Sequence, residues 1–353
     1  MRSPSTAGPL PVLVPDSPDI PGLTFRQGAP DDWAILTDVV NRARGSDGVN
    51  EVFGPDTLRA DYEPAVWFDM GRDLLIAELN GEMIGLAFGW RIQRGRSLSL
   101  EGWGVVLPEH RHRGIGTALH RATRARLAAE ASVDPRPGQR SFGSWALDIE
   151  RSDRALLADE GYVPIRFGFE MRRFLTGALP EHVLPDGLEL RPVTPDQYRA
   201  IFDADNEAFR DHWGHSEADG GDFRARFEHP ETDTSLWCVA WDGDQVAGSV
   251  MNGIYADENE QLGIRRGWLD HVSVRRAWRG KGVAKALCAA SFALLRDHGM
   301  EEAWLGVDAS NPTGALKLYE GLGFHVVRRW QAFGRPLDGP ASDGWLPEGD
   351  EAG

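Results

Sequence analysis

The sequence predicts a mixed α/β protein made of two tandem domains, because one series of strand, turn and helix patterns occurs twice along the chain. Residues 23–33 read LTFRQGAPDDW, and residues 188–198 read LELRPVTPDQY. Both segments begin with apolar residues at the two-residue period of a strand, and both then have a Pro-Asp pair, a plausible helix start. A repeated series of this kind indicates a duplicated domain.

The next parts of the repeat are a hairpin and a glycine-containing turn. Residues 74–89 and 236–253 each contain two apolar runs around an Asn-Gly or Asp-Gly pair, which supplies the positive φ angles of a tight turn. Residues 110–116 (HRHRGIG) and 278–284 (WRGKGVA) each lie between a strand-like run and a helix-like run. The order expected in each half is strand, helices, hairpin, strand, glycine turn, helix, strand, helix and strand.

Prolines without periodicity separate the two halves and also fill the N-terminal stretch, while the C-terminal stretch is polar. We therefore expect two domains of about 150 residues each, long enough to bury their own cores. The predicted division is a flexible arm 1–22, a first domain 23–175, a linker 176–187, a second domain 188–337 and a flexible tail 338–353.

Composition limits the kind of protein. In a chain of 353 residues, 41% are hydrophobic and 26% are charged, as is typical of a soluble globular protein. No apolar run approaches the ~18 residues of a membrane span. The net charge of −16 disfavours nucleic-acid binding and is compatible with a cationic partner such as an amine. Because Cys238 and Cys288 offer no disulfide framework or metal cluster, we expect a cytoplasmic protein without a metal.

The glycine turns have the residues of an anion site. Helical periodicity begins at about Lys281, and the first N–H groups of a helix lack partners and attract negative charge. The spacing fits neither a Walker A loop nor a dinucleotide fingerprint, so the alternatives are a cradle for another pyrophosphate or a purely structural turn. The candidate anion-binding residues are Arg279, Gly280, Lys281, Gly282, Val283 and Ala284 in the second half and Arg111, Arg113, Gly114 and Gly116 in the first.

These turns resemble the coenzyme A loop of the GNAT family, the GCN5-related N-acetyltransferases. The second half then reads WLGVDASNPTGALKLYEGLGF at 304–324, which is similar to the last motif of that family. The resemblance covers both halves and extends to tandem GNAT proteins of actinobacteria, of the mycothiol synthase type and of antibiotic gene clusters. It implies acetyl-CoA as co-substrate and, in each domain, a mostly antiparallel, splayed sheet flanked by helices.

The resemblance also implies roles for residues of the second half. The backbone at Val272 and Val274 would pair with the pantetheine arm, and an N–H group near Val274 would stabilise the oxyanion. Tyr319 occupies the position of the usual general acid, with an aromatic packing role as the alternative. Asn311 would bond the pantetheine or the splayed strand, or else form the turn before a proline.

The proton acceptor is less defined. Asp270 precedes Val274 by four residues, so strand alternation would put it on the same side as Val272 and Val274. It would take the proton directly or through water, unless it is a structural carboxylate, and Glu207 is the alternative base. Three further side chains follow in a segment where family members cover the acceptor amine; they are His212, Trp213 and His215. The alternatives are a metal bound by the two histidines, which no further ligand cluster supports, or ordinary loop packing.

The first half lacks the matching chemistry. Leu157 aligns with Tyr319 and Gly102 aligns with Asp270, while the adjacent Glu101 should face the other side of its strand. We therefore expect a catalytic C-terminal domain that acetylates a primary amine of a small molecule, with mycothiol synthase as one specific version. The N-terminal domain would bind acetyl-CoA without turnover. A non-catalytic acyl-CoA sensor or scaffold is the alternative, and the sequence does not define an oligomeric state.

Overall fold

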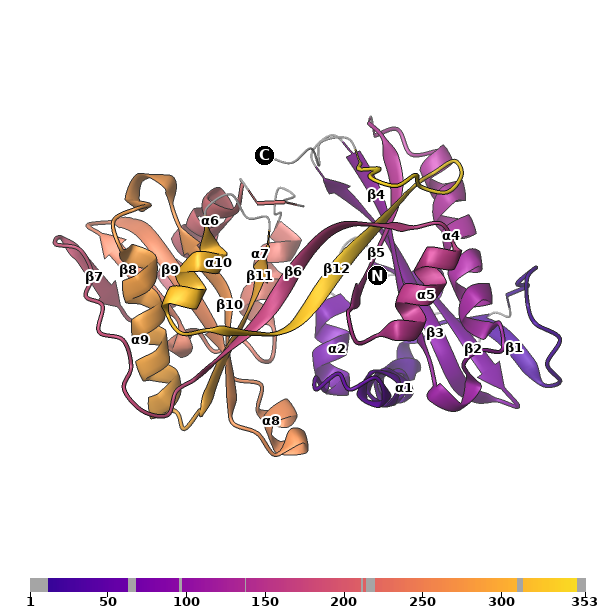
Figure 1. The fold of residues 1–353 in the computed structure, drawn as a ribbon, viewed down its shortest axis with the longest axis horizontal. Helices are drawn as coiled ribbons and strands as arrows, with labels where there is room; N and C mark the ends of the chain where they lie inside the picture. The colour runs from indigo at the N-terminus through magenta and orange to yellow at the C-terminus, as the bar shows by residue number, and fades with distance from the viewer. Residues whose placement is uncertain are drawn as a thin grey trace. The chain divides into compact units, whose positions relative to one another are not determined.

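The structure is a computed structural model that describes residues 12–62, 68–94, 97–136, 138–210, 212–213, 220–309 and 314–347. The chain divides into two compact units by its internal contacts. Unit 1 contains the chain up to Arg166 together with the segment from Gln331 onward, and unit 2 contains Phe167–Trp330. The two units repeat one arrangement of helices and strands, as the duplicated sequence pattern predicts (Figure 1).

Unit 1 is a sheet with helices on both faces. Its strands have the order β1-β2-β3-β4-β5-β12, and its pairs are antiparallel from β1 to β4 and parallel between β4 and β5. The elements in chain order are β1 (Leu23–Gln27), α1 (Trp33–Ser46), α2 (Pro55–Tyr62), α3 (Met70–Asp73), β2 (Leu74–Leu79), β3 (Glu82–Arg94), β4 (Ser97–Val106), α4 (Ile115–Ser132), β5 (Arg140–Leu147) and α5 (Arg151–Asp159).

Strand β2 shows how unit 1 buries both faces of its sheet. Its residues Leu74 and Ile76 pack with α1 and α2, whereas Leu75 and Ala77 pack with α4. A strand covered on both faces has a continuous apolar sequence instead of an alternating one, which explains the run LLIA.

Unit 2 repeats this plan, with the strand order β6-β11-β10-β9-β8-β7. Helices α6 and α7 pack on one face of its sheet, and α9 and α10 pack on the other. The elements are β7 (Leu188–Arg191), α6 (Tyr198–Phe209), α7 (Gly220–Glu228), β8 (Cys238–Asp242), β9 (Gln245–Gly253), α8 (Ala256–Leu262), β10 (Arg266–Val274), α9 (Val283–Asp297), β11 (Glu302–Asp308) and α10 (Ala315–Gly321).

The last strand of each half contributes to both units. Strand β6 (Val163–Phe174) begins in unit 1, but from Gly168 onward it pairs antiparallel with β11 of unit 2. Strand β12 (His325–Pro336) belongs to unit 2 up to Trp330 and to unit 1 from Gln331. The division predicted from chain order gives each half its own last strand, whereas the compact units exchange these strands.

The segments next to both termini pack on unit 1 within the described residues, contrary to the expectation of a flexible arm and tail. Val14 is buried in the apolar cluster that includes Ile115, and the amide of Val12 donates to the carbonyl oxygen of Phe25. On the C-terminal side, the amide of Ala341 donates to the carbonyl oxygen of Gly161. Long-range contacts of this kind are not visible in local composition, which is why polar, proline-rich sequence suggested mobility.

Candidate active site

The glycine turns have the same backbone in both units. In unit 2, Gly280 and Gly282 have φ angles of 75° and 88°; in unit 1, His112 and Gly114 have 58° and 85°. Gly282 and Gly114 are the N-cap residues of α9 and α4. Left-handed residues at such turns can direct backbone N–H groups toward one side, and the helix N-terminus adds positive potential. This geometry is suited to binding an anion such as a pyrophosphate.

The predicted loop residues differ in what they expose. Lys281, Gly280 and Gly282 are solvent-exposed, and no atom lies within 4 Å of a Cβ built on either glycine. Val283 is buried in the core of unit 2, so only its backbone is available to a ligand. Arg113 in unit 1 is exposed, with Nη1 3.4 Å from Nδ1 of His110. The unit 2 loop is therefore open to an anion.

The first arginine of each loop binds backbone oxygens of its own unit. Arg279 donates from Nε to the carbonyl oxygen of Val274 at 3.0 Å and from Nη2 to that of Ala208 at 2.8 Å. Arg111 makes the equivalent bonds to Val106 at 2.9 Å and to Ala43 at 3.0 Å. Both guanidinium groups thus connect the end of a strand to the end of a helix. These bonds show a loop-holding role for both arginines, and their contact with the anion stays a prediction.

Both sheets open beside these loops. In unit 2, β10 pairs with β11 only over Arg266–Trp268, although β10 continues to Val274. In unit 1, β4 pairs with β5 only over Leu98–Glu101, although β4 continues to Val106. Parallel neighbours that pair at one end and separate at the other form the splayed sheet that the resemblance implies. The opening exposes strand backbone next to the anion-binding turn.

A β-bulge in β10 corrects the predicted orientation of Asp270. Leu269 is opposite Asn252 and His271 is opposite Met251, so Asp270 is an extra residue in the strand. Its Oδ2 lies 2.6 Å from a Cβ built on Gly253, which shares a face with Met251 and α6. Asp270 and His271 therefore share the α6 face. Two other predicted residues, Val272 and Val274, pack on the opposite face with α9.

The side chain of Asp270 is exposed to solvent, yet Tyr255 and the backbone at Gly253 lie close to its carboxyl group. Desolvation by the surrounding protein raises its pKa to about 6, even though the hydroxyl of Tyr255 donates to its Oδ2 at 3.0 Å and opposes the shift. A carboxylate with a raised pKa can accept a proton near neutral pH. Its environment thus fits a base or a binding site for an ammonium group.

A second pair of titratable groups lies next to Asp270. The sequence did not predict this pair. Nδ1 of His271 is 3.2 Å from Oδ2 of Asp205, whose buried side chain also pairs with Nη1 of Arg226 at 2.5 Å. Burial favours the protonated acid, but His271 and Arg226 outweigh burial and lower the pKa of Asp205. A polar residue at a buried position of amphipathic α6 was the only sequence signal for this group.

The other predicted acceptor-side residues have different surroundings. Glu207 pairs with Arg275 at 2.7 Å, and this partner lowers its pKa, which makes Glu207 a poorer proton acceptor than Asp270. The ring of His212 packs on Phe209 with a centroid distance of 4.3 Å. Trp213 lies next to it at the end of the same described segment. Two predicted residues, His215 and Asn311, lie outside the described residues.

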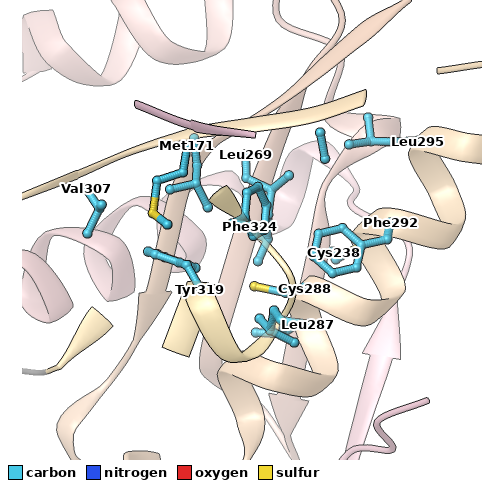
Figure 2. Packing of buried hydrophobic residues seen from close by; sticks show 14 of the residues in the cluster. Met171, Cys238, Leu269, Leu287, Cys288, Phe292, Leu295, Val307, Tyr319 and Phe324 are labelled. Atoms are coloured by element: carbon cyan, nitrogen blue, oxygen red, sulfur yellow. The ribbon is translucent and has the colours of Figure 1, made fainter. Parts of the chain in front are cut away.

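Tyr319 lies in the core of unit 2, in the apolar cluster against which Val272 and Val274 of β10 also pack. Its side chain is buried with Cys288, Met171 and Phe324, and its ring makes an edge contact with Phe324 at 5.9 Å (Figure 2). Burial and the nearby thiol of Cys288 raise the pKa of the Tyr319 phenol. A phenol with a raised pKa stays neutral and so keeps its proton for a hydrogen bond, but full proton transfer to a thiolate is less favourable. The packing and donor roles are therefore compatible in one side chain.

Unit 1 contains a cavity of about 250 Å³ at the position equivalent to the opening of unit 2. It is lined by Gly114 and Gly116 of the turn, by β4 and by Leu157, where unit 2 has Tyr319. His120 also lines it, and burial lowers the pKa of that imidazole to about 4, so the ring is neutral near pH 7. The cavity keeps space and anion-binding backbone but has an aliphatic side chain at the predicted acid position.

Glu101 of unit 1 does not face the side expected from the sequence. Strand β4 pairs with β3 in an unbroken register, so Glu101, Trp103 and Val105 share one face. Val105 packs with α1, which places Glu101 on the face equivalent to that of Asp270. Glu101 is buried and accepts a hydrogen bond of 2.5 Å from Ser99. The bulge that distinguishes β10 from β4 explains the wrong expectation.

Comparison with known proteins identifies the family. The acetyltransferase (GNAT) family model matches residues 42–134 and 198–324, one region in each half. The chain belongs to the GNAT acetyltransferase family. The protein is therefore an N-acetyltransferase, an enzyme that transfers an acetyl group to an amine, as the sequence predicted. The tandem architecture and the mixed α/β fold are confirmed as well.

Several relatives of this acetyltransferase are named mycothiol acetyltransferase. The one from Salinispora tropica is 35% identical over 237 residues, which are 65% of this chain and 71% of the relative. The one from Geodermatophilus obscurus is 29% identical over 302 residues, which are 83% of this chain and 92% of the relative. The resemblance extends through both halves in the second case.

Solved structures support the fold. A GCN5-related N-acetyltransferase from Sphaerobacter thermophilus has a TM-score of 0.70 at 24% identity, covering 92% of this chain and 98% of its own. A tandem GNAT protein from the clavulanic acid biosynthesis pathway has a TM-score of 0.67 at 16% identity, covering 91% and 100%. At these identities the likeness concerns the fold alone. Within the described residues, no helix is both long and apolar enough to span a bilayer.

Proposed function

We propose that unit 2 carries the acetyl transfer and that acetyl-CoA is the donor. The observation that carries this proposal is the difference between two equivalent openings. Unit 2 has Tyr319 in its core and Asp270 beside the opening, whereas unit 1 has Leu157 in place of Tyr319 and, on the face equivalent to that of Asp270, a buried Glu101 bonded by Ser99. A phenol supplies a hydrogen-bond donor for the departing thiolate, and a carboxylate supplies a group that can bind the acceptor ammonium or take its proton.

The donor would lie across the opening in the manner of the family. Its pyrophosphate fits the N–H groups at Gly280–Gly282, and Lys281 adds a positive charge beside them. Its pantetheine arm would extend along the unpaired part of β10, where the backbone at Val272 and Val274 can pair with it. Its acetyl group then reaches the start of the bulge. Asn311 would contribute from the neighbouring segment.

For the acceptor we propose a primary amine of a small molecule of the mycothiol type. The relatives named mycothiol acetyltransferase, at 29–35% identity, support this choice. The side chains on the α6 face, with His212, Trp213 and His215 in the following segment, would contact it. The acidic net charge of −16 suits an ammonium-bearing substrate, and we place the reaction in the cytoplasm.

Unit 1 would bind acetyl-CoA without turning it over. Its cavity of about 250 Å³ and its turn at Gly114 support binding, while Leu157 cannot donate a hydrogen bond to a leaving thiolate. Isothermal titration calorimetry with acetyl-CoA distinguishes the possibilities, because two sites per chain are expected. A single site that is lost on substitution of Gly282 would show that only unit 2 binds the donor.

Thiol release from acetyl-CoA across a panel of primary amines, including a cysteinyl amino-sugar conjugate, tests the catalytic assignment. We expect release with the wild-type protein and a loss of at least tenfold in the Tyr319→Phe and Asp270→Asn variants. Leu157→Met, a change in unit 1 that keeps the side-chain volume, is the control and should keep the wild-type rate. A wild-type protein that releases no thiol with any amine but binds acetyl-CoA tightly would favour the acyl-CoA sensor. Full activity in both unit 2 variants would show that neither residue takes part in the reaction.

A further inference from the structure

We infer that His271, oriented by Asp205, takes the proton from the acceptor ammonium in unit 2, and that the neighbouring Asp270 binds the ammonium charge. This inference rests on the proposed role of unit 2 and specifies which of its groups is the base. It depends on a pair of side chains that the alignment of the two halves does not reveal. The geometry around the bulge of β10 supports it in three steps.

The first step is the orientation of His271. Cross-strand pairing places His271 opposite Met251, and Trp268 opposite Gly253, so Trp268, Asp270 and His271 all lie on the α6 face. The pairing of β10 with β11 ends at Trp268. Asp270 and His271 therefore follow directly after the point where β10 and β11 separate. The thioester of a bound donor would reach the acceptor side at this point.

The second step is the anchoring of one ring nitrogen. Oδ2 of Asp205 lies 3.2 Å from Nδ1 of His271, and Asp205 is itself fixed by Arg226 at 2.5 Å. Among the described residues, neither Nδ1 of His271 nor Oδ1 of Asp205 has a hydrogen-bond partner, so the 3.2 Å contact has the distance of an ion pair but not the alignment of a hydrogen bond. Oδ2 of Asp205 is the acceptor within reach of the ring N–H group. Anchoring at Nδ1 leaves Nε2 as the nitrogen that can accept a proton.

The third step is the difference in exposure within the pair. The side chain of Asp205 is 2% exposed, whereas that of His271 is 37% exposed. A buried carboxylate behind a partly exposed imidazole is the arrangement by which enzymes fix the tautomer of a general base and stabilise its charged form. In the part of the chain that the structure describes, the charged groups near the ring are Asp205 on α6, Arg226 on α7 and Asp270 on β10, and Glu231 also acts on Asp270.

The proton balance follows from these positions. The ammonium gives one proton to Nε2 of His271, which passes it to solvent after turnover. The free amine attacks the thioester carbonyl carbon, and the carbon–sulfur bond breaks as the tetrahedral intermediate collapses. The nitrogen loses its second proton in this step, and the departing thiolate gains one, with Tyr319 as hydrogen-bond donor. The products are the acetamide, the thiol of coenzyme A and one released proton.

Chemical rescue tests this assignment. With an amine that the wild-type protein acetylates, we expect His271→Ala to lose ~100-fold or more in kcat/KM while binding acetyl-CoA normally by calorimetry. Imidazole in the buffer should raise the kcat/KM of His271→Ala by at least tenfold, after subtraction of the uncatalysed rate. Asp270→Asn should raise the KM for the amine and should not respond to imidazole. His325→Gln, an exposed histidine on β12, is the matched control and should behave as the wild type.

Two kinetic outcomes would overturn the inference. One is a His271→Ala protein with at least a third of the wild-type activity beside an inactive Asp270→Asn protein, because Asp270 would then be the base. The other is an inactive His271→Ala protein that imidazole does not restore, which would indicate packing. If no amine is acetylated by the wild-type protein, the proposed function fails separately. Long-range ¹H–¹⁵N spectra then decide, since the inference requires the Nδ1–H tautomer at His271, and the Nε2–H tautomer contradicts it.

Discussion

The hydroxyl of Tyr255 lies 3.0 Å from Oδ2 of Asp270, on the strand face that α6 covers. This contact opposes the desolvation that raises the pKa of Asp270 to about 6. Asp270 is therefore ionised at neutral pH at a cost to the folded state. Groups held in an unfavourable state often mark functional sites, because stability is exchanged there for chemistry.

We expect Asp270→Asn to stabilise the protein at high pH but not at low pH. The folded pKa of about 6 lies above the ordinary value of 3.8, so the folded state binds this proton more tightly than the unfolded state. Stability is thus lost as pH rises from about 4 through 6, and the asparagine variant avoids this loss. Thermal unfolding at pH 4.5 and pH 8 should show a higher Tm for the variant only at pH 8. An equal shift at both pH values would contradict a raised pKa.

Gly253→Ala should impair activity with little change in stability. A Cβ at this position would lie 2.6 Å from Oδ2 of Asp270 and 3.1 Å from the Tyr255 hydroxyl, so the carboxylate must move. The end of a flexible side chain moves at low cost, but its displacement should lower kcat/KM by about tenfold. Steady-state kinetics and denaturant unfolding measure the two effects. Gly45→Ala, where no atom lies within 4 Å, is the control and should leave the rate unchanged.

Tyr319→Phe should lower kcat by about 10- to 100-fold without weakening acetyl-CoA binding. Because burial raises the pKa of the phenol, the wild-type enzyme should show no alkaline loss of activity from this residue below pH 10. The pH dependence of kcat and calorimetric titration of acetyl-CoA check both statements. Tyr62→Phe in unit 1 makes the same chemical change far from Tyr319 in the sequence and should leave kcat unchanged. A variant with wild-type kcat would leave Tyr319 with a packing role alone.

Arg279→Ala should destabilise unit 2 by about 1–3 kcal/mol, because two backbone oxygens lose a charged donor. Arg279→Lys should recover little of this loss, since an ammonium cannot reproduce the two-pronged geometry. Urea unfolding measures the free energy. Arg265→Ala is the control, because its pair with Glu301 at 3.8 Å is exposed and should contribute close to nothing. A loss of acetyl-CoA affinity with unchanged stability would instead support the direct anion contact predicted from the sequence.

The sequence by itself was sufficient for the features that depend on neighbouring residues. Glycines at 280 and 282 before a helical run predicted a turn with positive φ angles, and both adopt them. The repeat predicted a duplicated α/β architecture, which the family match confirms. The contrast between Tyr319 and Leu157 could also be predicted from the sequence, because it depends only on which residue types occupy aligned positions of the two halves. Such patterns follow from short-range sterics and from helix or strand periodicity, and both depend only on residues close together in the chain.

Tertiary structure decided everything that depends on pairing between distant segments. The bulge at Asp270 is a property of the β9–β10 pairing, and one extra residue moves a side chain to the other face of the sheet. The partners of Arg279 lie on a strand end and on α6, which no local pattern connects. Asp205 meets His271 only because α6 packs on β9 and β10, although the two are far apart in the chain. Contacts of this kind form when the chain closes on itself, so the base of this acetyltransferase could be proposed only from the folded molecule.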